Sequence, residues 1–117
     1  MDLARGRAQG EFAPLTDGDP DTWWASPGDT AEIVIELGQE AAIGGIRIEE
    51  AIQFGQRVEG FAVDVRAWSG WYEHMRGTTI GAQRITALKP ASGNAVRIRI
   101  LSSQAPPVLA RVMVYAA

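Results

Sequence analysis

The chain contains no cysteine among its 117 residues, so disulfide bonds and thiol chemistry are excluded. It also lacks the run of about 18 apolar residues that a membrane-spanning helix needs, and no charged-then-apolar segment resembles a signal peptide. We therefore expect a fold stabilised by packing and no membrane partner. The compartment stays open, with an extracellular or periplasmic location expected if the chain is part of a larger secreted enzyme.

Basic residues are neither abundant nor clustered. The net charge is -3, and ten of the eleven basic residues are arginines spread along the chain, with Lys89 the single lysine. Nucleic-acid binding requires a basic face, so no nucleic-acid partner is expected. Arginine suits bidentate contacts to carboxylates and to hydroxyl-rich ligands, although a GC-rich genome would produce the same counts.

Short segments of alternating apolar and polar residues dominate the chain. In residues 31–37, Ile33, Ile35 and Leu37 share one face and the two glutamates lie on the other. Similar segments follow at 43–49, 61–68, 94–101 and 109–115. A period of two is typical of half-buried strands. Turn signals separate the segments, among them Gly38-Gln39, Ser69-Gly70 and Pro90 to Gly93. The pattern predicts an all-β, antiparallel β-sandwich with almost no α-helix.

The length suits one domain covering residues 1–117, and no repeat or linker divides it. The phase of the alternation predicts which residues form the core. These residues are Trp24, Ile35, Ile46, Phe61, Val63, Val65, Ile98 and Ile100.

The most distinctive stretch runs from Leu15 to Ser26 and reads LTDGDPDTWWAS. Between Asp17 and Thr22 it holds three acids, a glycine and a proline, a composition that predicts a tight loop. Its oxygen atoms would suit calcium, and a surface turn whose acids cap their own backbone amides is the alternative. Successive side chains of an extended segment alternate, so Trp24 is expected in the core and Trp23 near the surface.

Several motifs together resemble one family. LTDGDPDTWWAS, AEIVIELG, GQRVEGFAVDVRAW, GTTIGAQRI, VRIRI and PPVLARVMVY occur in an order that resembles the discoidin-like domain at the C-terminus of bacterial α-L-fucosidases. That domain is similar to coagulation-factor type C domains and to galactose-binding carbohydrate-binding modules. The resemblance covers Leu15 to Tyr115 and implies a jelly-roll β-sandwich. A family strand and loop that precede the acidic loop would not fit in the short segment from Leu3 to Ala13.

The resemblance implies a function without catalysis. We expect a non-catalytic carbohydrate-binding module of a glycoside hydrolase, with weak binding of fucose- or galactose-type glycans. The alternatives are a structural domain that packs on a glycosidase catalytic domain without a ligand, or an engineered or truncated version of such a domain. Many family members hold calcium with a glutamate of the last strand, but Arg111 stands at the matching position. We therefore expect no metal or cofactor, and Arg111 is expected to pair with the loop acids.

The predicted ligand-binding residues lie in loops that the family places together. Sugar sites combine several hydrogen-bonding groups with one apolar platform. Phe54 or Trp23 would supply the platform and Gln53 and Arg57 the donors, while Arg84 would point into the site or form an ion pair. Two alternatives remain: Arg57 pairs with Glu49 or Glu50, and Trp23 covers the end of the sandwich or an interface. The adjacent glutamates face opposite sides of a strand, which does not suit a glycosidase acid and base.

Overall fold

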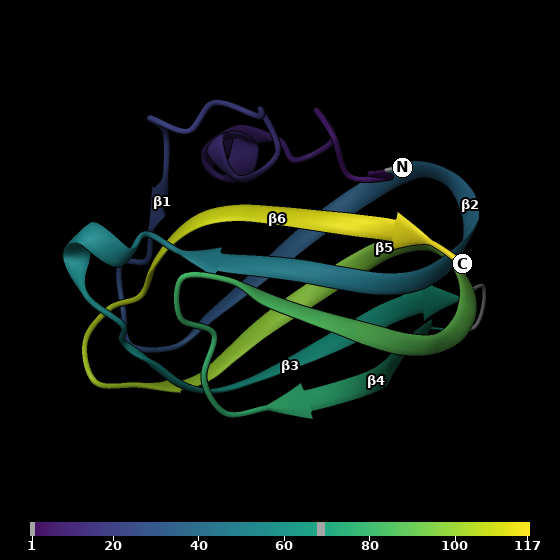
Figure 1. Ribbon diagram of the computed structural model, residues 1–117. Helices are drawn as coiled ribbons and strands as arrows, with labels where there is room; N and C mark the ends of the chain where they lie inside the picture. The colour runs from purple at the N-terminus through teal and green to yellow at the C-terminus, as the bar shows by residue number, and fades with distance from the viewer. Residues whose placement is uncertain (1, 68–69) are drawn as a thin grey trace.

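The chain forms a curled antiparallel sheet that closes into a sandwich (Figure 1). A computed structural model describes residues 2–67 and 70–117. Its elements are η1 (Gly10–Leu15), β1 (Trp24–Ala25), β2 (Ala31–Glu50), η2 (Ile52–Phe54), β3 (Val58–Ala67), β4 (Gly70–Gly77), β5 (Arg84–Ser103) and β6 (Val108–Ala116). The strand order is β1-β6-β2-β5-β3-β4, and every pairing is antiparallel. The predicted all-β sandwich is confirmed.

Two strands of 20 residues each, β2 and β5, run through both layers of the sandwich. In the first layer, residues 31–36 of β2 pair with residues 95–100 of β5, which also pairs with β3. In the second layer, residues 43–50 of β2 lie between the start of β5 and β6. The turn signals predicted strand ends at Gly38-Gln39 and near Gly93, but the structure has bends there inside continuous strands.

Glycine permits these bends for two separate reasons. Gly38 has a φ of +84°, a conformation that other residues rarely adopt. At Gly93 the constraint is space, because an added Cβ would overlap Val65 and lie 2.7 Å from the carbonyl oxygen of Arg66. The sequence signals therefore mark where each strand passes from one layer to the other. The predicted turn at Ser69-Gly70 lies partly outside the described residues.

The core is one cluster between the layers, and it follows the predicted strand phase. All eight predicted core residues are buried, from Trp24 at 5% exposure to Ile35 at 0%. The final strand β6 pairs with β1 and β2, as a jelly roll requires. The N-terminal segment contributes buried Ala4, Ala8 and Leu15 instead of a full edge strand.

Candidate functional site

Several connections meet at one end of the sandwich, and this loop end contains most of the predicted site. The backbone amide of Ala51 donates to Val108, and that of Gln104 donates to Arg57. The amide of Glu50 donates to Gly81 in the connection between β4 and β5. Figure 1 shows η2 at the opposite end from both termini. The loop end is therefore built from segments that are far apart in the sequence.

An exposed pair of aromatic rings lies at the loop end. The rings of Trp23 and Phe54 meet edge to face, with centroids 5.0 Å apart and an interplanar angle of 60°. Trp23 is 42% exposed and Phe54 is 40% exposed. Trp24 points inward, where its indole N–H donates to Glu11 over 3.1 Å. The predicted alternation of the two tryptophans is thus confirmed, and it leaves one large ring at the surface.

Arg57 braces the loop that carries Phe54. Its Nε donates to the carbonyl oxygen of Phe54 over 3.2 Å, and its Nη1 donates to that of Pro106 over 2.8 Å. The alternative in which its guanidinium pairs with Glu49 or Glu50 is wrong. Glu49 instead pairs with Arg47, and Glu50 accepts the backbone N–H of Arg57. A guanidinium has five N–H donors, so this brace leaves some of them for a ligand.

The other two predicted site residues, Gln53 and Arg84, lie in different surroundings. Gln53 lies in η2 beside Phe54 and is exposed, and its amide makes no hydrogen bond within the described residues. Arg84 donates to the Thr79 carbonyl over 3.0 Å and lies over the ring of Phe61, 5.5 Å from its centroid. It forms no ion pair within the described chain, and its contacts do not reach the ring pair.

The acidic loop satisfies its own polar groups. The carboxylate of Asp17 accepts the amide of Asp19 and the hydroxyl of Thr22, and that of Asp19 accepts the amide of Asp21. The Asp19 amide is the main reason that the pKa of Asp17 is below its usual value, with Thr22 and the more distant charge of Arg111 adding to it. This arrangement is the surface turn considered above as the alternative to a calcium loop.

Guanidinium groups surround the same loop. Arg5 lies against Gly18, where an added Cβ would overlap its guanidinium, and Arg111 lines a small cavity with both residues. Among the described residues Arg111 forms no ion pair with the loop acids, so the predicted pairing is wrong. No group of three or more potential metal ligands occurs among residues 2–67 and 70–117. A metal-free loop therefore stays a prediction.

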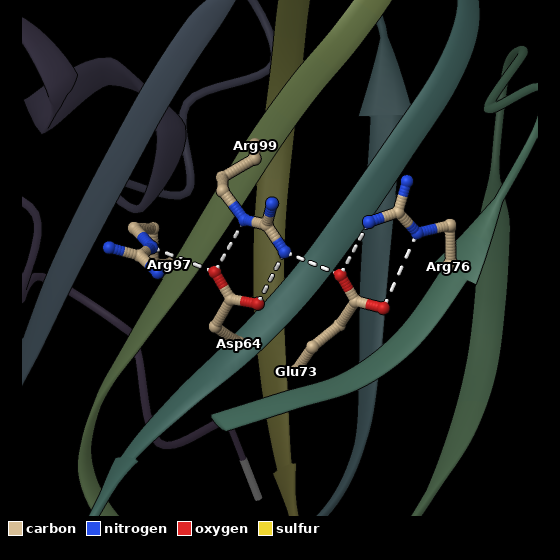
Figure 2. Close-up of polar contacts among 5 residues, drawn as sticks. All are labelled: Asp64, Glu73, Arg76, Arg97 and Arg99. Atoms are coloured by element: carbon tan, nitrogen blue, oxygen red, sulfur yellow. Dashed lines mark hydrogen bonds and ion pairs between the residues drawn. The ribbon is translucent and has the colours of Figure 1, made fainter. Parts of the chain in front are cut away.

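A second polar cluster covers the outer face of the first layer (Figure 2). Asp64 points away from the core, yet its side chain is only 1% exposed. It accepts bonds of 2.7 Å from Arg97 Nε, 2.7 Å from Arg99 Nε and 2.8 Å from Arg99 Nη2. Glu73 extends the cluster by binding Arg99 and Arg76.

The cluster stabilises its carboxylates in the charged form. Burial opposes the ionisation of Asp64, but the hydrogen bonds from Arg99 and Arg97 outweigh this effect and lower its pKa. The pKa of Glu73 is lowered mainly by Arg76 and then by Arg99. Because both carboxylates are held ionised, neither is suited to donate a proton. A surface hollow of about 550 Å³ lies beside Arg99 and Glu32, and its lining residues include no aromatic side chain.

Comparison with known proteins identifies the family. The model of the F5/8 type C domain matches residues 6–113. The chain belongs to this family. The domain is 31% identical over 108 residues to "Putative alpha-L-fucosidase 1" of Oryza sativa subsp. japonica, covering 89% of this chain and 21% of that protein. The F5/8 type C domain thus spans about a fifth of the length of this relative. The predicted resemblance to the C-terminal domain of α-L-fucosidases is confirmed.

Solved structures give the same relationship. SpGH29 is 31% identical, has a TM-score of 0.91 and covers all of this domain, which matches 28% of that chain. A Ruminococcus gnavus GH29 fucosidase in complex with fucose is 27% identical, with a TM-score of 0.83 and 27% of its chain matched over the whole domain. Chitosan-binding module 1 of Paenibacillus sp. IK-5 is 17% identical, with a TM-score of 0.84 over 99% of each chain, and shows a shared fold alone.

The sequence patterns above did not single out two carboxylates that the structure buries, Glu50 and Asp64. Glu50 ends β2 in phase with buried Ile46 and Ile48, so the alternation itself placed it on the inner face. Asp64 lies on the outer face. The sequence indicates such a carboxylate through Arg97 and Arg99, which share one strand face and require a counter-charge.

The described part of the chain contains no helix with the length and hydrophobicity that a membrane span requires.

Proposed function

We propose that this domain is a non-catalytic carbohydrate-binding module, an accessory domain of an α-L-fucosidase-like glycoside hydrolase. The exposed ring pair of Trp23 and Phe54 at the loop end carries the proposal. F5/8 type C domains are typically non-catalytic binding modules, and several of the matched relatives bear the names of fucosidases. The ligand class that we propose is fucose- or galactose-type glycans.

The ring pair offers a platform that suits a sugar. A pyranose has an apolar face of C–H groups that stacks on an aromatic ring. Because the two rings meet edge to face, the angle between them leaves room for a second apolar group of the ligand. Gln53 precedes Phe54 in η2, and Arg57 binds the carbonyl oxygen of Phe54, so we propose that both residues supply hydrogen bonds to the ligand. A shallow, solvent-exposed site of this kind should bind with millimolar to high-micromolar affinity, or roughly 4–6 kcal/mol.

The carboxylates support a function without catalysis. Glycoside hydrolysis by the usual route needs an acid and a second carboxylate on either side of one bond. At the loop end, Glu49 forms an ion pair with Arg47. The carboxylate of Glu50 accepts hydrogen bonds from three backbone N–H groups. On the outer face, Asp64 and Glu73 are ionised and form ion pairs with arginines. None of these groups is arranged as a proton donor in an open cleft.

The position of the loop end fits a tethered module. Asp2 forms a β-bridge with Tyr115, so the two ends of the chain lie together, and Figure 1 shows them opposite η2. A catalytic domain joined at either terminus would leave the ring pair facing away from the junction. We propose that residues 1–117 act as one domain in this way, so that weak binding raises the local concentration of the enzyme at its substrate.

Matched variants test the proposal. The domain is displayed in multiple copies and its retention is measured on surfaces coated with fucosylated, galactosylated or chitosan glycans. Trp23→Ala and Phe54→Ala should abolish retention, whereas Ile85→Ala, which removes another exposed apolar side chain, should leave it unchanged. Equal retention of all variants would contradict the proposed site, and the absence of wild-type retention on every surface would contradict sugar binding.

The same exposed rings favour one alternative function. Trp23 and Phe54 form an exposed apolar pair, exposed Ile52 lies two residues before Phe54, and exposed apolar patches also mark contacts between protein surfaces. In that case the domain would pack on a catalytic domain and bind no sugar of its own. Loss of catalytic-domain stability in the ring variants of a full-length enzyme, without any wild-type glycan retention, would favour this alternative.

A further inference from the structure

A buried carboxylate lies directly beneath the loop end. Glu50 is the last residue of β2 and is 2% exposed. Its Oε1 accepts the backbone N–H groups of Arg57 over 2.8 Å and Val58 over 3.0 Å. Its Oε2 accepts the backbone N–H of Gly81 over 2.8 Å. One side chain therefore connects the end of β2, the start of β3 and the connection between β4 and β5.

These contacts satisfy backbone groups that the loops would otherwise leave without partners. Buried amide groups require acceptors, and an ionised carboxylate accepts several short, charge-assisted bonds at once. The backbone of Glu50 also donates to the carbonyl oxygen of Gly81 over 2.9 Å, so Glu50 and Gly81 are joined in both directions. No arginine or lysine side chain pairs with this carboxylate in the described structure. Its hydrogen-bond partners in the described structure are backbone N–H groups of two loops and of the first residue of β3, as expected for a group that holds loops against the sheet.

The segment that Glu50 holds contains half of the proposed site. Residues 51–56 leave the sheet after Glu50 and return at Arg57, and both ends of this excursion are fixed by the same carboxylate. Within it lie Gln53 and Phe54. The guanidinium of Arg57 then holds the carbonyl of Phe54. The position of the Phe54 ring against Trp23 thus depends on Glu50 through the backbone of Arg57.

We propose that Glu50 is the positioning residue of the carbohydrate site, acting through the loops without touching the sugar. This inference rests on the function proposed above. It gives Glu50 a role in affinity, because a platform that is already ordered before binding loses less conformational entropy when the ligand binds. The inference predicts that disturbing the carboxylate weakens sugar binding even while the sandwich stays folded.

Glu50→Gln is the informative substitution. Glutamine keeps the size of the side chain but turns one acceptor oxygen into an N–H donor. In one orientation the new amide opposes the N–H of Gly81, and in the other it opposes those of Arg57 and Val58. Glu49→Gln is the matched control, since Glu49 lies on the opposite face and pairs with Arg47. Ile98→Val is a second control that lowers stability in the core, away from the loops.

The experiment uses the whole chain and two readouts. Amide hydrogen exchange reports the loops, and titration with fucose and galactose followed by NMR reports affinity. In Glu50→Gln, exchange at Arg57, Val58 and Gly81 should accelerate and affinity should fall at least about tenfold, while core amide shifts are retained. Glu49→Gln and Ile98→Val should keep the wild-type affinity. Glu50→Asp, whose shorter side chain cannot reach all three amides, takes the place of the glutamine variant if that one does not fold.

The outcomes separate this inference from the function on which it rests. Wild-type affinity in a folded Glu50→Gln or Glu50→Asp variant would overturn the positioning role alone and leave the binding module intact. An equal loss of affinity in Ile98→Val would also overturn it, because general destabilisation would then explain the effect. If the wild-type chain shows no sugar-dependent shift, the proposed function fails, and the site that Glu50 would position fails with it.

Discussion

Replacement of Asp64 by asparagine removes the charge at the centre of the outer-face cluster. The carboxylate accepts three hydrogen bonds of 2.7–2.8 Å from Arg97 and Arg99, whose side chains are 23% and 22% exposed. Breaking a buried ion pair on one side costs roughly 3–5 kcal/mol. This cost is reduced because water reaches both arginines in part and because the asparagine keeps one oxygen that accepts hydrogen bonds. We therefore expect the free energy of unfolding to fall by about 2–4 kcal/mol.

Urea unfolding at neutral pH, followed by tryptophan fluorescence, measures this loss. Glu73→Gln is the matched control, since its side chain is 39% exposed and an exposed ion pair contributes only about 0.2–1 kcal/mol. A decrease below about 1 kcal/mol for Asp64→Asn would refute the reasoning, because the cluster would then behave as an ordinary surface network.

The pH dependence gives an independent check. The folded state lowers the pKa of Asp64, so its contribution to stability is present above the unfolded value of about 3.9 and is lost as pH falls through the lower folded pKa. The stability difference between wild type and Asp64→Asn should therefore shrink below about pH 4. A difference that stays constant down to pH 2 would contradict the lowered pKa.

Two further predictions concern the core and the acidic loop. Ile98→Ala should lower the free energy of unfolding by about 2–5 kcal/mol, because Ile98 is fully buried, and a loss below about 1 kcal/mol in a urea titration would contradict the packing. Millimolar calcium should leave the wild-type melting temperature unchanged, whereas Arg111→Glu should gain calcium-dependent stability, about 2.7 kcal/mol at 100 times its dissociation constant. A calcium-dependent rise in the wild type, reversed by a chelator, would show that the loop binds the ion despite Arg5 and Arg111.

The strands and the core could be predicted because they depend on a period that is visible in the sequence. Alternation in VRIRI placed Ile98 and Ile100 inside and Arg97 and Arg99 outside, and the structure agrees. Strand length could not be predicted in the same way. Gly38 signals a turn locally, but the pairing partner bends at Gly93 at the same place, so both strands continue across the fold.

The site was predictable only in part, since its contacts join distant segments. Trp23 and Phe54 could each be placed at the surface from local pattern and family resemblance, and the structure brings their rings together. The partners of Arg57 are backbone carbonyls, one of them Pro106, and backbone acceptors leave no trace in residue type. Glu50 was visible to strand phase as an inward residue, but its three amide partners appear only once the loops are folded.

The most direct test of the carbohydrate-binding account is an NMR titration of the unmodified chain with fucose, galactose and their oligosaccharides. The proposed site predicts concentration-dependent shifts at the amides of residues 50–57 and at the indole of Trp23, with midpoints in the high-micromolar to millimolar range, or roughly 4–6 kcal/mol. The absence of any shift in these residues at tens of millimolar sugar, on the order of ten times the weakest predicted dissociation constant or more, would contradict the account.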